Sequence, residues 1–596
     1  MGLVGRIRRH PYALFFGALI AVAFAYTFYR ACTLRIDYCD SFMYRQSAMR
    51  LWGYELEYFD LRPPLLAMLL APVIELARSL GSSMAGLFRA TALEAAVMSA
   101  LSALAVVWAL KRPVGWTAAL FGGVLFVANR FFVRYGAHVM TDVITAGTIS
   151  AAIAAYLAGR DRRHLGWFAL CGFFLGMTAL LRYNVVTVFA GFFVGELYVS
   201  VRRWRVHDRA WTGLLLACFV ALVMFVQAHR WVFEHVYGDP SLERFFRIYE
   251  DLKTGSAVDR GGESPWDYWS MGMLALGPIP FALAGTGLVL AVLWPKDGDG
   301  IFLGVFLSIG GALFITPHTE ARYALPLLPS IVYFGARTVE AIGSTVGPWL
   351  RARHWTLRAV GAVVVTATCA QAAAPGVAQA VLDDDPIFRT TAFQRVAQAM
   401  ARVPSGRAWW NGMTTTLCPR ELDTFPEDDF FNVFHSCVEG LAFYTGRAPL
   451  VAREPGVLLE GVFAQRGRDG DLLIQLSDLR WPDTRELLRA RPPMRYTLSY
   501  VVRTELALTG ERYEHVEGER RITMSSRTDD VWTFTSTGPR GRFSVFARTT
   551  ATGYPLKLGN IDLEPGRPVS LSGRAGTSPE RIVLVGARDR EVVQAP

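Results

Sequence analysis

Two acidic residues stand just beyond the first apolar segment of the chain. Asp37 and Asp40 lie in the stretch IDYCDSFMYRQSAMRLW, among aromatic residues and ahead of a run that suits a helix. A carboxylate on such a partly dry surface beside a membrane suits a general base that takes a proton from a hydroxyl acceptor. A solvated loop acid is the simpler alternative, and the aromatic surroundings argue against it.

Arg62 is the second candidate, and Pro63 and Pro64 follow it directly. Proline favours an extended conformation in the residue before it, so the guanidinium points from the end of the loop towards the membrane surface. The forked donors of arginine match a phosphate group. The alternative is an interfacial arginine that keeps its charge in water and its stem on apolar surface.

A third group lies where one apolar segment ends and the next begins. The stretch ANRFFVRYGAHVMTD contains Arg134, His138 and Asp142, with Asp142 about one turn inside the second segment. An acid at membrane depth is costly and usually has a function. The alternative is that Asp142 pairs with Arg134 or His138 to neutralise a buried charge.

The fourth group is the stretch ITPHTEARYALPLLP, which places His318, Glu320 and Arg322 in a short loop. Arg322 is predicted to be a second contact to a phosphate. His318 and Glu320 are candidate ligands of a divalent metal, although two ligands without a third are a weak zinc pattern. A salt-bridged turn is the simpler alternative.

The composition places these residues in a membrane protein. Of the 596 residues 52% are hydrophobic and 19% are charged, whereas soluble domains have about a quarter charged residues. The net charge of +10 does not indicate nucleic acid, because lysine and arginine gather in the cytoplasmic loops of membrane proteins. The first apolar run lacks a small-residue cleavage site, so we expect an uncleaved first span.

We predict a polytopic α-helical membrane domain over residues 1–380, with about eleven spans of nearly 20 residues each. The predicted spans are residues 12–30, 87–110, 114–130, 139–158, 165–181, 183–200, 212–233, 269–293, 301–316, 323–343 and 358–377. Residues 64–80 are apolar too, but they contain Pro72, Glu75 and Arg78 and suit an amphipathic interfacial helix as well as a span.

The basic residues decide between these two possibilities for residues 64–80. If this segment does not cross, the basic clusters near residues 6–9, 111–112, 160–163, 202–209, 296 and 351–358 all lie on one side. That is the positive-inside pattern with a cytoplasmic N-terminus. We therefore predict a juxtamembrane helix, outer loops at 31–86, 234–268 and 317–322, and an extracytoplasmic C-terminal part.

The C-terminal part is predicted to be soluble and to contain two domains. Residues 383–480 alternate helical and strand patterns, as in FQRVAQAMARV, RAWWNGMTT and DLLIQLSD, which indicates an α/β domain. Residues 490–596 contain short alternating strands such as YTLSYVV, VWTFTST and GRFSVFAR, which indicate a β-rich domain. Cys418 and Cys437 lie on the predicted outer side, where a disulfide is permitted.

The motifs resemble a known family. Asp40, Tyr44, Ala48 and Leu51 at helical spacing, followed by RPPL, and the later HTEARYALPLLP and PWDYWSMGMLALGPIPFAL resemble the GT-C membrane glycosyltransferases. The similarity covers about residues 12–345 and is greatest to the bacterial branch of the protein O-mannosyltransferase and aminoarabinose transferase group. That group usually has Asp-Glu where this chain has Asp40 and Ser41.

The resemblance implies a hexosyl or pentosyl transferase that takes its sugar from a polyprenyl-phosphate donor. Transfer would be inverting, without a nucleotide, onto a glycan, lipid or protein at the outer face of a bacterial inner membrane. Asp40 would be the base, with Asp37 as a possible partner, Asp142 a supporting acid, and Arg62 and Arg322 contacts to the phosphate. The further candidates for substrate contact are Tyr44, Arg134, His138, His318 and Glu320.

Two other functions fit parts of the same sequence. A transporter or flippase of lipid-linked sugars would bury ionisable groups near the midplane between inverted repeats, whereas the charges here gather at one face and no repeat is visible. A non-catalytic membrane subunit that binds a glycan or a protein would make use of the C-terminal domains. Transfer from a polyprenyl-phosphate sugar, measured in membranes, distinguishes both from an enzyme.

Overall fold

The computed structural model describes most of residues 11–351, with gaps at 36, 38, 55–62, 204–207, 238–275 and 316–320, short helical stretches between 367 and 402, residues 443–444, and the strands with adjoining turns between 408 and 594. The contacts divide the chain into two compact units, Met1–Arg389 and Thr390–Pro596. Each unit is described by itself.

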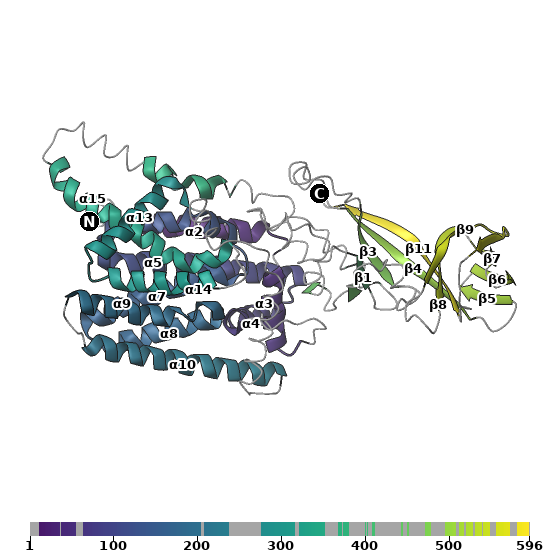
Figure 1. Cartoon of the computed structure of the whole chain (residues 1–596), viewed down its shortest axis with the longest axis horizontal. Coiled ribbons are helices and arrows are strands. Elements are labelled where there is room, and N and C mark those ends of the chain that lie inside the picture. The colour runs from purple at the N-terminus through teal and green to yellow at the C-terminus, as the bar shows by residue number, and fades with distance from the viewer. Residues whose placement is uncertain are drawn as a thin grey trace. The chain divides into compact units, whose positions relative to one another are not determined.

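The first unit is a bundle of helices whose long axes lie side by side (Figure 1). Its helices are α2 (Pro11–Thr33), α3 (Cys39–Leu51), α4 (Pro64–Ser79), α5 (Met84–Val127), α6 (Arg130–Tyr135), α7 (Thr141–Arg162), α8 (Leu165–Leu181), η1 (Tyr183–Val185), α9 (Val188–Arg203), α10 (Asp208–Tyr237), α13 (Pro278–Leu293), α14 (Asp299–Ile315), η2 (Ala321–Leu327) and α15 (Leu328–Arg351).

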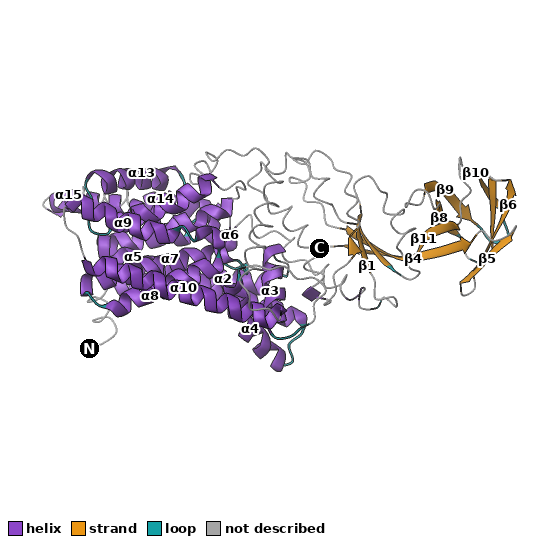
Figure 2. Ribbon diagram, turned by 60° about the horizontal axis from the view of Figure 1, so that its bottom comes forward, coloured by secondary structure: helices purple, strands orange, loops and turns teal. Residues whose placement is uncertain are grey.

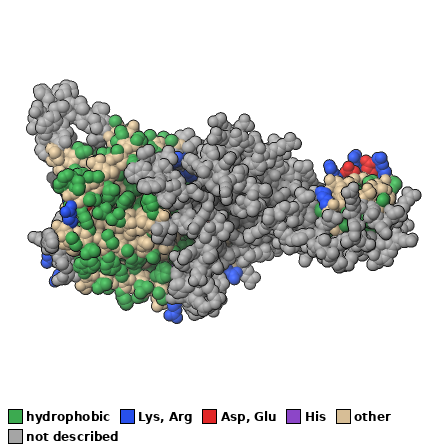
Figure 3. Space-filling view, in the orientation of Figure 1, with side chains coloured by type: hydrophobic (Ala, Val, Ile, Leu, Met, Phe, Trp, Pro, Cys, Tyr) green, Lys and Arg blue, Asp and Glu red, His purple; other side chains and the backbone are tan. Residues whose placement is uncertain are grey.

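Helices α2, α5, α7, α8, α9, α10, α13, α14 and α15 coincide with predicted apolar segments, while the predicted spans 269–293 and 358–377 lie partly outside the described residues. Among the described residues α2, α5, α7 and α10 are long and apolar enough to cross a membrane, and α8, α13 and α14 are shorter apolar helices. Hydrophobic side chains spread over the exposed face of the bundle (Figure 3), and Leu215, Phe219 and Leu222 on α10 are exposed examples. Such a surface requires an apolar solvent, so the chain is an integral membrane protein.

Helix α5 contains two predicted spans, which are joined by one tight turn. Gly115 has φ 77° and ψ 173°, a conformation that glycine alone adopts without strain. Beyond the turn Gly123 packs against Val107, and Gly122 packs against Leu110. Residues on the two sides of Gly115 are therefore neighbours, and the element is a helical hairpin.

Helices α3 and α4 lie together at one end of the bundle (Figures 1 and 2). Helix α4 has 16 residues, and Trp52 Nε1, just after α3, donates a hydrogen bond to the carbonyl of Ala71 at 2.7 Å. Helices α9 and α13 also have 16 residues, so the length of α4 does not decide whether it crosses the membrane. Its juxtamembrane position and the predicted count of about eleven spans stay predictions.

The basic loops meet at the other end of the bundle. Arg112 pairs with Asp161 at 2.7 Å, Arg160 donates to the carbonyl of Asp297 at 3.0 Å, and Arg202 donates to the carbonyl of Val292 at 3.3 Å. These contacts bring the clusters at 111–112, 160–163, 202–209 and 296 to one end, as the sequence predicts.

The second unit contains two sheets. One has the strand order β2-β1-β3-β4-β11-β8-β9 and the other β10-β7-β6-β5. The strands are β1 (Ala408–Asn411), β2 (Leu450–Val451), β3 (Leu472–Ser477), β4 (Arg495–Ala507), β5 (Arg512–Glu517), β6 (Arg520–Thr528), β7 (Val531–Ser536), β8 (Gly541–Arg548), β9 (Leu556–Leu563), β10 (Val569–Ser572) and β11 (Arg581–Gln594).

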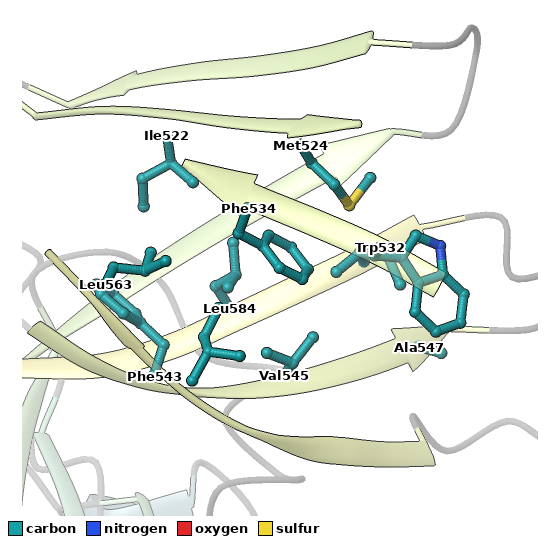
Figure 4. Close-up of a cluster of buried hydrophobic side chains, with 11 residues drawn as sticks. Ile522, Met524, Trp532, Phe534, Phe543, Val545, Ala547, Leu563 and Leu584 are labelled. Carbon is teal, nitrogen blue, oxygen red and sulfur yellow. The ribbon is translucent and has the colours of Figure 1, made fainter. Parts of the chain in front are cut away.

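The two sheets enclose one hydrophobic core. Trp532 and Phe534 on β7 face Phe543 and Val545 on β8 (Figure 4). The predicted alternating strands coincide with β4, β7 and β8, while β1 pairs in parallel with β2 and β3. Strand β3 also pairs antiparallel with β4, so a single sheet runs through both segments that the sequence presents as separate domains. Cys418 and Cys437 lie outside the described residues.

Candidate active site

The three acidic candidates lie at the α3–α4 end of the bundle. Asp40 is in the first turn of α3, Asp142 is in the first turn of α7, and Asp37 is in the short connection between α2 and α3. The side chain of Asp40 is 22% exposed, whereas those of Asp37 and Asp142 are 0% and 2% exposed. Of these three carboxylates, Asp40 is the most exposed.

Asp40 forms an ion pair with Arg322, whose Nη1 lies 2.8 Å from Asp40 Oδ2. Arg322 is in the short helix η2, which directly precedes α15. The same Nη1 is 4.0 Å from the sulfur of Met140, just ahead of α7. Two candidates separated by more than 280 residues are thereby brought together, as the resemblance implies.

Asp142 pairs with Arg182, the residue that follows the last turn of α8. The expected alternative, pairing with Arg134 or His138, is therefore wrong, because α8 returns the chain to the start of α7 and delivers Arg182 there. Arg182 is not among the residues that the sequence singles out. The signal that identifies Arg182 is a cation directly after one apolar span, at the same depth as an acid at the start of the neighbouring span.

Tyr323 joins the two ion pairs. The guanidinium of Arg182 lies 4.7 Å from the centre of the Tyr323 ring, and that of Arg322 lies 5.6 Å from it. The face of an aromatic ring attracts cations, so one ring holds both guanidinium groups. The series Asp40, Arg322, Tyr323, Arg182 and Asp142 thus forms a continuous, mostly buried polar network from α3 to α8.

Asp37 belongs to a second, fully buried cluster. Its Oδ1 is 2.6 Å from His138 Nδ1, and its Oδ2 is 2.8 Å from Arg45 Nη2. Burial by itself would raise the pKa of the Asp37 carboxyl, but Arg45 and His138 together hold that pKa well below its usual range. The carboxylate therefore stays ionised at neutral pH, and its oxygens are engaged within the protein.

The remaining candidates have different positions. Tyr44 and Arg134 are buried, and the guanidinium of Arg134 lies 5.5 Å from the ring centre of Tyr135. Arg62, His318 and Glu320 lie outside the described residues. Their predicted roles stay predictions.

Within the described ranges no group of three His, Cys, Asp or Glu residues could hold a metal ion. The sequence Asp297-Gly-Asp299, which resembles a metal-binding motif, lies at the opposite end of the bundle. Asp299 accepts hydrogen bonds from the Tyr333 hydroxyl and from the backbone nitrogen of Lys296 at 2.6 Å. It therefore connects α14 to α15 within the fold.

The polar network from Asp40 to Asp142 can do two kinds of chemistry. The Asp40 carboxylate is accessible enough to accept a proton from a hydroxyl group. Arg182 and Arg322 supply fixed positive charge in a poorly hydrated setting, where electrostatic interactions are stronger than in water. A site of this kind can activate a nucleophile and stabilise a departing anion in the same step.

The sequence of the chain is similar to those of known glycosyltransferases. Residues 62–231 match the family model of dolichyl-phosphate-mannose-protein mannosyltransferases. The lipid A galacturonosyltransferase RgtD of Rhizobium johnstonii is 26% identical over 341 residues, which are 57% of this chain and 66% of that protein. The match thus spans about two thirds of the relative's length.

Two solved structures have a similar fold. ArnT from Cupriavidus metallidurans, bound to undecaprenyl phosphate, aligns with a TM-score of 0.54 and 17% identity over 81% of this chain and 95% of its own. The archaeal oligosaccharyltransferase AglB from Archaeoglobus fulgidus, in complex with an inhibitory peptide and a dolichol-phosphate, aligns with a TM-score of 0.53 and 10% identity over 79% of this chain and 70% of its own.

The chain is therefore similar in sequence to dolichyl-phosphate-mannose-protein mannosyltransferases over residues 62–231 and to the galacturonosyltransferase RgtD. Its fold is that of ArnT and of the oligosaccharyltransferase AglB.

Proposed function

We propose that the protein transfers a sugar from a polyprenyl-phosphate donor to a hydroxyl acceptor, in one inverting displacement. The observation that carries the proposal is the ion pair between the accessible Asp40 and Arg322, which shares the Tyr323 ring with Arg182. A carboxylate next to anchored guanidinium groups is what hydroxyl attack on a phosphate-linked sugar requires.

The proposed transfer forms one bond and breaks another. The acceptor oxygen forms a bond to the anomeric carbon while the bond between that carbon and the phosphate oxygen breaks. The acceptor proton moves to a carboxylate oxygen of Asp40, and polyprenyl phosphate leaves with the bonding electrons. Arg322 and Arg182 stabilise the charge that accumulates on the departing phosphate.

We place this site at the outer face of a bacterial inner membrane. The basic clusters at 111–112, 160–163 and 296 lie at the opposite end of the bundle, and lysine and arginine concentrate on the cytoplasmic side. In this orientation the N-terminus is cytoplasmic and the C-terminal unit is extracytoplasmic. RgtD acts on lipid A according to its name, so lipid A is the first acceptor to test.

The test of the proposed function replaces Asp40, the proposed general base. In purified protein with a radiolabelled polyprenyl-phosphate sugar, we expect Asp40→Asn to lower kcat at least about 100-fold, because a general base contributes about 10²–10⁴-fold. The exposed Asp161, at the other end of the bundle, provides the control Asp161→Asn, which should match the wild type. Full activity of Asp40→Asn would disprove the assignment of the base.

A further inference from the structure

The Asp37 carboxylate connects segments from three parts of the chain. Besides His138 Nδ1 at 2.6 Å and Arg45 Nη2 at 2.8 Å, it accepts a weak hydrogen bond from the backbone nitrogen of Val139 at 3.4 Å. Arg45 is in α3, whereas His138 and Val139 precede α7. One buried carboxylate after α2 therefore contacts both the middle of α3 and the residues just before α7.

Arg45 is fixed from a second direction by α5. Its Nε donates a hydrogen bond to Thr91 Oγ1 at 2.8 Å, and its guanidinium lies 4.2 Å from the centre of the Phe88 ring. Arg45 is completely buried. A buried guanidinium needs a partner of opposite charge, and Asp37 is that partner.

Both sides of the active site are attached to this cluster. On α3, Asp40 is five residues before Arg45. On the α7 side, Val139 is followed by Met140, whose sulfur contacts Arg322, and shortly afterwards by Asp142. The Asp37 cluster therefore lies between the candidate base and the acid that holds Arg182.

We propose that Asp37 is a positioning residue, which fixes the Asp40 end of α3 relative to the start of α7. This inference rests on the proposed function, because it gives Asp37 a role through Asp40. The side chain of Asp37 is 0% exposed, so it touches no substrate. Its contribution is geometric, and displacement of reacting groups by about 1 Å can lower a rate about 100-fold.

The first experiment separates binding from turnover. Asp37→Asn keeps the shape of the side chain but removes the charge opposite Arg45. In the folded, purified variant we expect kcat to fall at least about 10-fold while KM for the polyprenyl-phosphate donor changes less than about 3-fold, since the phosphate contacts remain.

A matched control comes from the opposite end of the bundle. Asp299 is also completely buried, and its Oδ1 lies 3.5 Å from Arg337 Nε. Asp299→Asn should lower the yield of folded protein and leave kcat and KM of the purified fraction unchanged. If Asp37→Asn behaves in the same way, Asp37 only stabilises the fold and the proposal is wrong.

A second measurement does not depend on activity. Hydrogen–deuterium exchange, read by mass spectrometry, should show amides of α3 exchanging at least about 10-fold faster in Asp37→Asn, because they lose an anchor. In Asp299→Asn the faster exchange should be confined to the start of α14 and the middle of α15, where Tyr333 and Arg337 contact Asp299. Unchanged exchange of α3 in Asp37→Asn would overturn the proposal, whatever the kinetics.

A double variant distinguishes positioning from proton transfer. Asp37→Asn/Arg45→Gln removes both buried charges and leaves two amides that can hydrogen-bond, so the uncompensated guanidinium is gone. We expect kcat to recover at least about 3-fold relative to Asp37→Asn. No recovery would assign a chemical role to the Asp37 carboxylate and overturn the positioning role.

The two hypotheses fail in different ways. Absence of transfer by the wild type overturns the proposed function, together with any role of Asp37 through Asp40. Transfer that is lost in Asp40→Asn but unchanged in kcat in Asp37→Asn overturns only the positioning role.

Discussion

Tyr323 contributes to the site through its ring face. The guanidinium groups of Arg182 and Arg322 lie 4.7 Å and 5.6 Å from the ring centre. Such a contact is worth about 0.5–2 kcal/mol, more when it is poorly hydrated. The ring keeps two like charges close together while each is neutralised by its own aspartate.

This geometry predicts different effects for two substitutions. Tyr323→Phe keeps the ring, so KM for the donor should stay within about 2-fold of the wild type. Tyr323→Leu removes the ring, and losing about 1.4 kcal/mol should raise KM about 10-fold. Steady-state kinetics with varied donor concentration measures both. Equal effects of the two variants would show that the hydroxyl, and not the ring face, matters.

The sequence singles out two charged residues but does not show which residues pair with each other. Asp40 and Arg322 stand out because they are charged residues in loops beside apolar segments, and the structure pairs them. Arg182 follows an apolar run of α8 and looks like an ordinary cation at the end of a span. Its role depends on the packing of α8 against α7, which hydropathy does not determine.

At the level of elements, close helix packing supports the site. Helices α9 and α14 approach each other at glycines, and a Cβ atom built on Gly304 would lie 2.0 Å from the carbonyl oxygen of Gly191. Small residues allow helix backbones to come together in membranes. Helix α14 precedes η2, so this contact helps to hold the element that carries Arg322.

Two alanine substitutions on α14 test the contact. Gly304→Ala forces the helices apart and should lower the free energy of unfolding by about 1–3 kcal/mol. Gly310 has no atom within 4 Å of a built Cβ, so Gly310→Ala should be neutral or stabilise by up to about 1 kcal/mol. Melting temperatures in detergent measure the difference. Equal melting temperatures would contradict a close α9–α14 contact.

Hydropathy located the helices well because each apolar run must be long enough to cross the bilayer. It did not decide the position of α4, whose composition suits both a span and an interfacial helix. The charge distribution favours an interfacial helix there, since the basic loops have to share one side, and that position stays a prediction. Helix ends were less predictable. The predicted span 323–343 begins within the short helix η2, so α15 starts only at Leu328.

At the level of the whole molecule, the C-terminal unit has its own core, centred on Trp532 and Phe534 of β7 (Figure 4). Alternation along β7 buries every second residue, which is the pattern that predicted the strand. Pairing of β3 with β4 was not predictable, because the pairing of two strands leaves no mark in the periodicity of either one.

The independent core gives a prediction about the two units. Trp532→Ala should destabilise the second unit by about 3–5 kcal/mol, the usual cost of deleting a large buried side chain. Heating followed by trypsin should then cut within Thr390–Pro596 at a lower temperature, while Met1–Arg389 keeps its resistance. Thr535→Ala, on the less buried face of β7, is the control. If both units became sensitive to trypsin at the same lowered temperature, the two units would not have separate cores.

The turn at Gly115 has a consequence for how the protein is made. Since the two halves of α5 are joined by hardly more than one glycine with φ 77°, we expect the two apolar segments to enter the bilayer together as a hairpin. A side chain at position 115 would therefore reduce the number of molecules that reach the membrane, and the molecules that arrive would work at the normal rate.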